Sequence, residues 1–226
     1  GRLGDGVWDA NPKDPRKTGG RFVRAESAFR NWVGADASSA FPAAAGRYRL
    51  IVSHACPWAH RTVIFRTLKG LDDAIPLTVV DPLMGENGWI LPDGNPVHTV
   101  YTAAMADYSG RVTVPILWDT KTETIVNNES SEIIRMFNDA FAGVGAPGRD
   151  FYPEALRPEI DSVNERIYQT VNNGVYRCGF STAQDAYEEA VTALFETLDW
   201  LEERLTGQRF LVGNTLTEAD WRLFTT

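Results

Sequence analysis

The chain has 226 residues, and its 22 Lys and Arg against 30 Asp and Glu give a formal net charge of −8. This acidic balance argues against binding to nucleic acid or to an anionic membrane surface, because phosphates would repel the chain. The sequence contains no apolar run near about 18 residues and no apolar segment at its start, so we predict neither a membrane span nor a secretory signal. Its two cysteines form no disulfide framework, which favours a reducing, cytoplasmic setting.

The first regular element is expected near residue 47. Residues 1–46 lack clear periodicity, and we interpret them as an extended arm anchored on a core by Phe22, Phe29 and Trp32. Residues 48–52 alternate between apolar and less apolar positions, as a strand does.

A helix is predicted directly after this strand. Pro57 suits the first turn of a helix, which we expect over residues 58–69 and which ends before Gly70. A second short strand is predicted over residues 77–81. Residues 82–111 then form a long connection rich in Gly and Pro, which we expect to be a functional or mobile loop.

Two further strands, 114–119 and 123–127, are predicted around a polar turn, and Ser130 is the expected N-cap of the next helix. The order of elements is strand–helix–strand, excursion, strand–turn–strand–helix. This order is the thioredoxin-type arrangement, so we predict a thioredoxin-like α/β domain over residues 47–142.

The rest of the chain has a helical pattern. A Gly- and Pro-rich link occupies residues 143–153, after which apolar residues recur at spacings of three and four. A capping box is predicted at 181–184 and another helix start at Thr217. We therefore predict an all-α domain over residues 154–226. The sequence stops inside its last helix, so we expect this domain to be incomplete.

Cys56 is the strongest candidate for chemistry, because it lies between a strand and the start of a helix. The unpaired N–H groups and partial positive charge of a helix N-terminus favour a thiolate, which is the reactive form of cysteine. Position 59 is Ala, so a mixed disulfide on Cys56 must be resolved by an external thiol. The alternative is that Cys56 is a buried small hydrophobe. Cys178 lacks this context, and we interpret it as structural.

Two other signals could contribute to a ligand site. Pro115 at a strand start readily adopts the cis form, which would expose the backbone of Val114 to a ligand. Glu129 and Ser130 at a helix entrance can bind a zwitterionic amino-acid end. An edge-strand proline and an ordinary helix cap are the alternatives. A thiolate, a strand proline and this acid–hydroxyl pair together are what glutathione needs. The scattered His and Cys residues have no metal-ligand spacing, so no metal is expected.

Five segments carry a resemblance to a known family. They are SHACPWAHRT at 53–62, GENGW at 85–89, RVTVPILWD at 111–119, NNESSE at 127–132 and NNGVY at 172–176. In this order and spacing, the chain resembles the glutathionyl-hydroquinone reductases, the Xi class of glutathione transferases, from about residue 21 to its end.

The resemblance implies a glutathione transferase fold and the reduction of a glutathionyl-hydroquinone, with glutathione as co-substrate. It implies that Cys56 is the nucleophile and that Tyr176 transfers a proton beside the aromatic ring. It also implies a homodimer and a glutathione site formed by Trp89, Arg111, Val112, Thr113, Val114, Glu129 and Ser130.

Two other functions remain open on the sequence. An Omega-like cysteine transferase would act on dehydroascorbate or on protein mixed disulfides without a quinone conjugate. A non-catalytic binding protein of glutathione transferase fold is the second alternative, and the presence of Cys56 with Glu129 and Ser130 argues against it.

Overall fold

The computed structural model describes residues 1–11, 18–146 and 148–226. Those within Gly1–Pro12 and Glu26–Arg149 form one compact unit, and those within Lys13–Ala25 and Asp150–Thr226 form a second. The predicted arm therefore contributes to both units, and the division after Arg149 falls within the predicted link. Residues 12–17 of that arm and Pro147 of that link lie outside the described residues.

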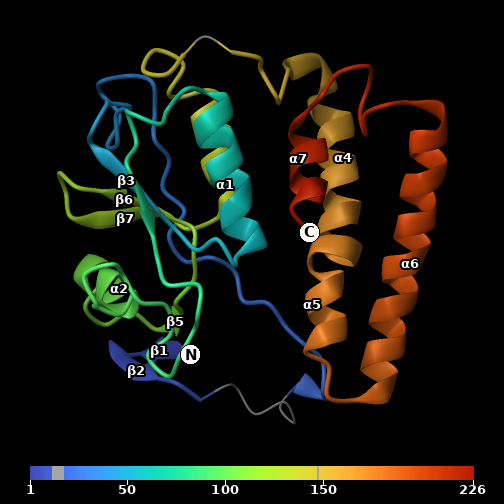
Figure 1. Cartoon of the computed structure of the whole chain (residues 1–226), viewed down its shortest axis with the longest axis horizontal. Helices are drawn as coiled ribbons and strands as arrows, with labels where there is room; N and C mark the ends of the chain where they lie inside the picture. Colours follow the sequence, from blue (N-terminus) through green and yellow to red (C-terminus); the bar gives the residue numbers. More distant parts are fainter. Residues whose placement is uncertain (12–17, 147) are drawn as a thin grey trace. The chain divides into compact units, whose positions relative to one another are not determined.

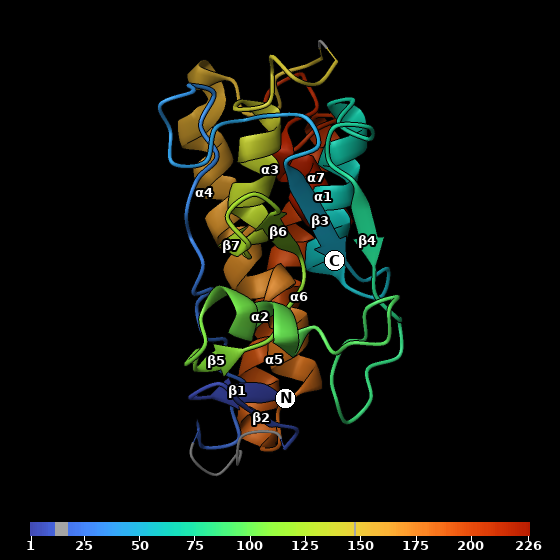
Figure 2. The same ribbon diagram turned by 90° about the vertical axis from the view of Figure 1, so that its left-hand side faces the viewer.

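The first unit contains a four-stranded sheet of order β4-β3-β6-β7 (Figures 1 and 2). Its strands are β3 (Tyr48–Val52), β4 (Leu77–Val79), β6 (Ile116–Asp119) and β7 (Thr124–Asn127). The pair β3–β4 is parallel, whereas β3–β6 and β6–β7 are antiparallel.

Helices complete this unit. Helix α1 (Pro57–Leu68) connects the parallel strands, and α3 (Ser130–Asn138) follows β7 and packs against α1 (Figure 2). This is the thioredoxin-like domain that the order of predicted elements indicated.

The sheet is covered on both faces. Leu50 pairs with Leu117 and Ile51 pairs with Ile116, and the four side chains are at most 4% exposed. Successive residues of a strand point to opposite faces, so each pair contributes to a different layer of the core. Because both faces are filled, a ligand site has to use strand ends and the loops that follow them.

The connection over residues 82–111 is not a simple loop, contrary to expectation. It contains α2 (His98–Ala104) and β5 (Gly110–Arg111). Helix α2 has only seven residues, several of them β-branched, and no side-chain cap, so local propensity barely indicates it. The burial of Tyr101 and Val97 in the core stabilises the helix instead.

The chain begins with a β-hairpin that packs on the first unit. Strands β1 (Arg2–Gly4) and β2 (Val7–Asp9) join β5 in a sheet of order β2-β1-β5. Asp5 and Gly6 form its turn with φ of 47° and 76°, as tight hairpin turns require. Further along the predicted arm, Phe29 is a buried anchor, as expected. Trp32 is 48% exposed, so its prediction as an anchor was wrong.

The second unit is helical, as predicted. It contains η2 (Glu154–Leu156), α4 (Arg157–Ile167), the π-helical segment η3 (Tyr168–Asn172), α5 (Gly174–Gly179), α6 (Gln184–Gly207) and α7 (Glu218–Phe224) (Figure 1). The helix start predicted at Thr217 is confirmed, and Thr217 and Asp220 form a capping box there. The capping box predicted at 181–184 is wrong, because α6 begins after Ala183 and the Ser181 hydroxyl instead donates to the Arg177 carbonyl.

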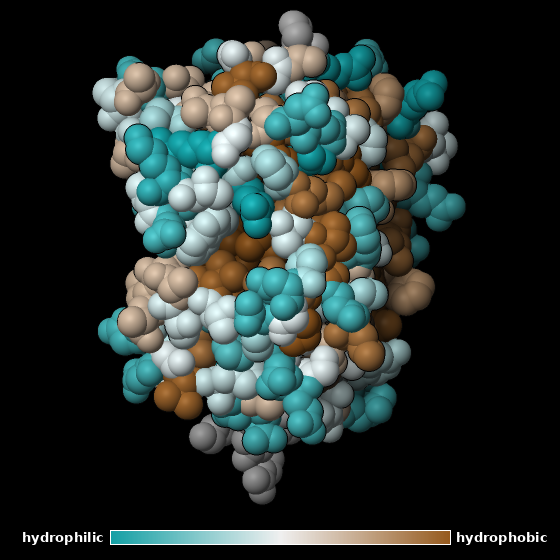
Figure 3. All heavy atoms as spheres, turned by 60° about the vertical axis from the view of Figure 1, so that its left-hand side comes forward, coloured by the Kyte–Doolittle hydropathy of each residue, from teal (hydrophilic) through white to brown (hydrophobic). Residues whose placement is uncertain are grey.

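Hydrophobic residues reach the surface in patches between hydrophilic side chains on the face that Figure 3 shows. Among the described residues, the most exposed large apolar side chains are Leu83 at 77%, Val7 at 71%, Val23 and Phe224 at 66% each, Phe180 at 62% and Phe195 at 58%. Within the described ranges, no helix has the length and apolar character needed to cross a membrane.

A buried ion pair joins the start of β3 to the end of β6. Arg47 Nε and Nη2 donate to the Asp119 carboxylate at 3.0 and 2.6 Å, and Thr122 Oγ1 and Lys121 N donate to it at 2.7 and 3.0 Å. Burial alone would raise the pKa of Asp119, but the hydrogen bonds, above all those from Arg47, hold that pKa below its ordinary value.

We expect Asp119→Ala to lower the free energy of unfolding by about 3–5 kcal/mol, because the Arg47 guanidinium is then buried without its partner. In the unsubstituted chain the carboxylate has a lower pKa folded than unfolded, so its contribution is present above about pH 4. It is lost as the pH falls through the folded pKa.

Urea unfolding at a series of pH values measures both effects. Asp107→Ala, at an exposed carboxylate, is the control and should change the free energy by less than about 0.5 kcal/mol. Equal stabilities for the two variants would contradict the expected role of the ion pair.

Candidate active site

Cys56 lies at the start of α1, as the sequence predicted. It is the N-cap, in extended conformation with φ of −104° and ψ of 113°, and Pro57 begins the helix. The Cys56 N–H donates to the Ser53 carbonyl at 3.1 Å, and the Ala55 N–H donates to Ser53 Oγ at 3.2 Å. This turn, anchored on a buried serine, holds a half-buried sulfur beside the first N–H groups of the helix.

The sulfur of Cys56 contacts the strand-proline segment. Its Sγ–H donates to the Val114 carbonyl at 3.4 Å, and the Val114–Pro115 peptide is cis. A thiol can donate this hydrogen bond and a thiolate cannot, so ionisation of Cys56 releases the Val114 carbonyl. The pairing of β6 with β3 begins at Ile116, so Val114 lies just before the paired part of the strand.

Arg111 lies on the exposed side of the same segment. It belongs to β5, and its partner across the β1–β5 ladder is Arg2. Like charges opposite one another in a ladder repel, so an anion bound near this pair would be stabilised. Val112, the next residue, packs on the core cluster that contains Tyr101 and Tyr108.

The entrance of α3 differs from the expected one. Ser130 is the first residue of the helix rather than its N-cap, and the N-cap is Glu129. Glu129 Oε1 accepts from the Ser131 N–H at 3.1 Å and from Ser131 Oγ at 2.9 Å, and Oε2 accepts from Ser27 Oγ at 3.1 Å. The longer Glu129 side chain reaches the first-turn N–H, so it takes the capping role.

This entrance retains capacity for a ligand. A carboxylate has about four acceptor sites, and the described contacts of Glu129 use three of them. Ser130 is 3% exposed, and its hydroxyl makes no hydrogen bond with any described group. Buried hydroxyls are almost always paired, so an unmatched one at a helix start points to a polar ligand group.

The loop that carries Trp89 is held by the N-terminal hairpin. Trp8 Nε1 donates to the Glu86 carbonyl at 3.0 Å, and the Trp8 ring stacks on His98 with centroids 4.7 Å apart. Gly88 has φ of 73°, and a Cβ there would lie 3.1 Å from the Trp8 ring, so any other residue would be strained. Trp89 itself is half-buried on the same core cluster as Val112.

Tyr176 belongs to the second unit. It lies on α5, where its ring contacts those of Phe22 and Phe180 with centroids 6.0 Å away in each case. The Arg24 guanidinium lies 4.5 Å from the Tyr176 ring centroid, and Arg24 Nε donates to Asn173 Oδ1 at 2.5 Å. Phe22 therefore packs beside Tyr176, which gives the predicted arm a specific contact within this unit.

The predicted residues of the first unit are connected through groups that the sequence did not single out. Tyr101 hydrogen bonds to Thr113 and to Asn128, and Ser27 binds Glu129. Ser27 carries no sequence signal. Asn128 belongs to the NNESSE segment, whose motif could have drawn attention to it, and Tyr101 lay in the predicted loop.

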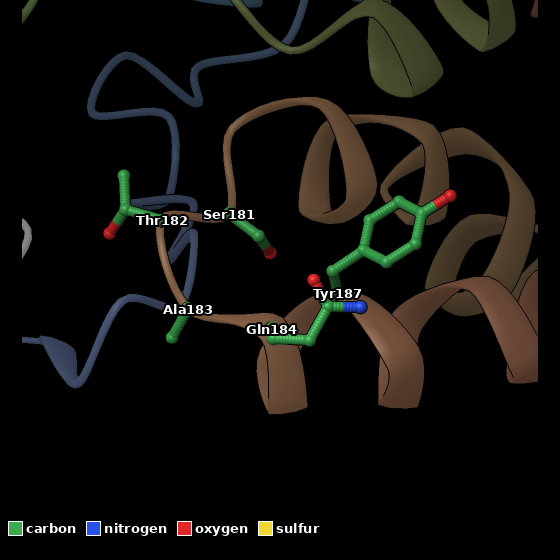
Figure 4. Close-up of a pocket in the computed structure, with 5 residues that line it drawn as sticks. All are labelled: Ser181, Thr182, Ala183, Gln184 and Tyr187. Carbon is green, nitrogen blue, oxygen red and sulfur yellow. The ribbon is translucent and has the colours of Figure 1, made fainter.

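Neither Cys178 nor a surface hollow of the second unit belongs to this group. Burial raises the pKa of the Cys178 thiol, which supports its interpretation as structural. An open hollow of about 380 Å³ is lined by Ser181, Thr182, Ala183, Gln184 and Tyr187, none of which is a predicted site residue (Figure 4). Among the described residues, no group of three or more His, Cys, Asp or Glu could hold a metal ion.

Comparison with known proteins identifies both units. Residues 55–140 match the N-terminal domain model of glutathione S-transferases, and residues 184–226 match the C-terminal domain model. The glutathionyl-hydroquinone reductase PcpF of Sphingobium chlorophenolicum is 54% identical over 237 residues, covering 100% of this chain and 74% of that protein. The glutathionyl-hydroquinone reductase YqjG of Escherichia coli (strain K12) is 53% identical, with the same coverage.

Solved structures agree with these matches. The glutathione-bound structure of YqjG superposes with a TM-score of 0.88 and 50% identity, covering 100% of this chain and 73% of that one. The glutathione-S-transferase Xi of Phanerochaete chrysosporium gives a TM-score of 0.87 at 52% identity, covering 92% of this chain and 71% of that one.

The hairpin contact predicts an effect of Trp8 on the Trp89 loop. Trp8→Ala removes the stacking on His98 and the hydrogen bond to Glu86, so we expect a loss of about 1–3 kcal/mol in unfolding free energy. Amide hydrogen exchange over residues 81–97 should also become faster. Trp32→Ala is the matched control, and it should change stability by less than about 0.5 kcal/mol. Unchanged exchange over residues 81–97 in Trp8→Ala would show that the hairpin does not hold this loop.

Proposed function

Because the chain belongs to the glutathionyl-hydroquinone reductases, the Xi class of glutathione transferases, we propose that it reduces glutathionyl-hydroquinones with glutathione. The products are the hydroquinone and glutathione disulfide. The 3.4 Å contact between Cys56 Sγ and the Val114 carbonyl is the main structural support. The thiol of a tripeptide that pairs with the Val114 segment would come close to this sulfur.

In the first half-reaction, the Cys56 thiolate attacks the sulfur of the conjugate. A Cys56–glutathione disulfide bond forms and the bond between sulfur and the aromatic carbon breaks. The electron pair of the broken bond returns to the ring, and the ring carbon takes one proton, which Tyr176 donates. The ring then leaves as the hydroquinone, reduced by two electrons relative to the conjugate.

In the second half-reaction, the thiolate of a second glutathione attacks the glutathione sulfur of the mixed disulfide. Glutathione disulfide leaves, and Cys56 is regenerated as the thiolate. Ala59 stands where a C-x-x-C motif has its second cysteine, so an external thiol is needed at this step. The net reaction consumes one conjugate and one glutathione and yields one hydroquinone and one glutathione disulfide.

The glutathione site is proposed at the segments that surround Cys56. Arg111 would bind the glycine carboxylate, and the Val114 backbone would pair with the cysteinyl residue. Glu129 has acceptor capacity for the γ-glutamyl ammonium, and the Ser130 hydroxyl can bind the adjacent carboxylate. The remaining proposed contacts are the indole of Trp89 and the residues Val112 and Thr113 of the same segment as Val114.

We also propose the domain boundaries, the oligomeric state and the cellular location of the protein. We assign glutathione binding to residues 47–142 and interpret 143–153 as a link to the helical domain over 154–226. A homodimer follows from the resemblance. We also propose a cytoplasmic location, because glutathione is the reductant and the two cysteines of the sequence are too few for a disulfide framework.

Cys56→Ser should lower the rate of hydroquinone release at least about 100-fold, because a serine hydroxyl is a far weaker nucleophile toward sulfur than a thiolate. The assay mixes a glutathionyl-hydroquinone with glutathione and follows both products by chromatography. Cys178→Ser is the matched control and should retain the activity of the unsubstituted protein. The nucleophile assignment fails if Cys56→Ser keeps substantial turnover while its circular dichroism spectrum is unchanged.

Tyr176→Phe should lower kcat for the conjugate by about 100-fold and leave the Kd for glutathione within about twofold, because only the proton transfer is lost. Tyr187→Phe, at a 42% exposed tyrosine of the same unit, is the control and should change neither quantity. Equal kcat values for the two variants would reduce Tyr176 to a packing role.

A further inference from the structure

We propose that Tyr101 is a positioning residue for glutathione, since its hydroxyl ties the segment before Val114 to the segment before Glu129. The inference rests on the proposed function, because it takes Val114, Glu129 and Ser130 as glutathione contacts. Tyr101 has no part in the chemistry described above and is not expected to touch the substrate.

The hydroxyl of Tyr101 makes four hydrogen-bond contacts to two segments of the chain, and the longest of them joins it to Thr113 Oγ1 at 3.3 Å. It donates to the Thr113 carbonyl at 2.9 Å, and it accepts from the Thr113 N–H at 3.2 Å and from Asn128 Nδ2 at 3.0 Å. A phenol has one proton and two acceptor sites, so these neighbouring groups occupy its full capacity. Neither segment can shift without breaking a hydrogen bond in a water-excluded place.

The ring of Tyr101 is itself fixed. Tyr101 is 0% exposed, and its ring contacts the rings of Phe29 and Tyr108 at centroid distances of 5.7 and 5.0 Å. Tyr108 also holds the segment before Val114, because its hydroxyl donates to the Arg111 carbonyl at 3.0 Å. Burial raises the pKa of Tyr101, which keeps the proton that the bond to Thr113 needs.

Each tied segment continues directly into a proposed glutathione contact. Thr113 precedes Val114, whose carbonyl lies 3.4 Å from Cys56 Sγ. Asn128 precedes Glu129, and its Oδ1 accepts from the Phe29 N–H at 3.2 Å, which fixes the amide orientation. The hydroxyl of Tyr101 therefore sets the separation between the segment expected to pair with the tripeptide backbone and the helix start expected to hold its γ-glutamyl end.

A positioning role and a merely structural role predict different results for one pair of variants. Tyr101→Phe removes only the hydroxyl. Tyr48→Phe is the matched control, because Tyr48 is also 0% exposed in the first unit and its hydroxyl donates to the Pro42 carbonyl at 2.8 Å. Both variants lose a buried hydroxyl, so both should lower Tm.

The measurement is the Kd for glutathione by isothermal titration calorimetry, with full-length folded protein. We expect Tyr101→Phe to raise Kd about tenfold, equivalent to about 1.4 kcal/mol, and Tyr48→Phe to raise it less than twofold. In turnover, the KM for glutathione should rise in Tyr101→Phe with kcat changed less than threefold. A Kd for Tyr101→Phe within threefold of that for Tyr48→Phe would overturn the proposal.

A second variant serves if Tyr101→Phe does not fold. Asn128→Asp keeps an acceptor for the Phe29 N–H but replaces the donor to Tyr101 with a second acceptor, which competes with Thr113 for the phenolic proton. It should raise Kd at least threefold over the control, and a smaller change would overturn the proposal. Because calorimetry needs no hydroquinone, a protein that binds glutathione without reducing conjugates would refute the proposed function alone. A protein that does not bind glutathione would refute both.

Discussion

The step from β3 into α1 is the constraint on which the site depends. The strand ends at Val52 and the helix begins at Pro57, so four residues must turn the chain from an extended to a helical path. Ser53 is buried and fixes this turn with its carbonyl and its hydroxyl. Cys56 therefore meets the helix N-terminus with its sulfur held beside the Val114 carbonyl. The other elements of the unit supply a surface around that sulfur.

That surface is assembled from segments that are distant in sequence and are joined in the core. Tyr101 connects residues 113 and 128, the hairpin supports the loop before Trp89, and Ser27 binds the carboxylate of Glu129. Each of these groups acts through a hydrogen bond to a backbone atom or to a capping side chain. Tyr101 is the buried support among these three groups, whereas the hydrogen bonds of Trp8 and Ser27 lie at more exposed positions.

Short-range signals made part of this arrangement predictable from the sequence. Pro57 predicted the start of α1, and Thr217 with Asp220 predicted the start of α7, because these helix-start signals depend on neighbouring residues alone. The cap of α3 was misplaced by one residue, because Glu and Ser can both cap and only the fold decides which reaches the N–H. The hydrogen bonds of Tyr101 could not be predicted from the sequence, because its partners lie 12 and 27 residues away along the chain.

The N-cap residues of α1 and α3, Cys56 and Glu129, differ in how they cap their helices. The Cys56 side chain makes no capping hydrogen bond to α1, whereas the Glu129 carboxylate accepts from the Ser131 N–H in the first turn of α3. If the ammonium group of the ligand binds the same carboxylate, then ligand binding also affects how well the first turn of α3 is ordered. Truncating Glu129 would then remove a helix cap and a ligand contact at once, and alanine scanning at this position would report their sum. Separating the two contributions requires a double-mutant cycle with Ser131, which shares only the cap.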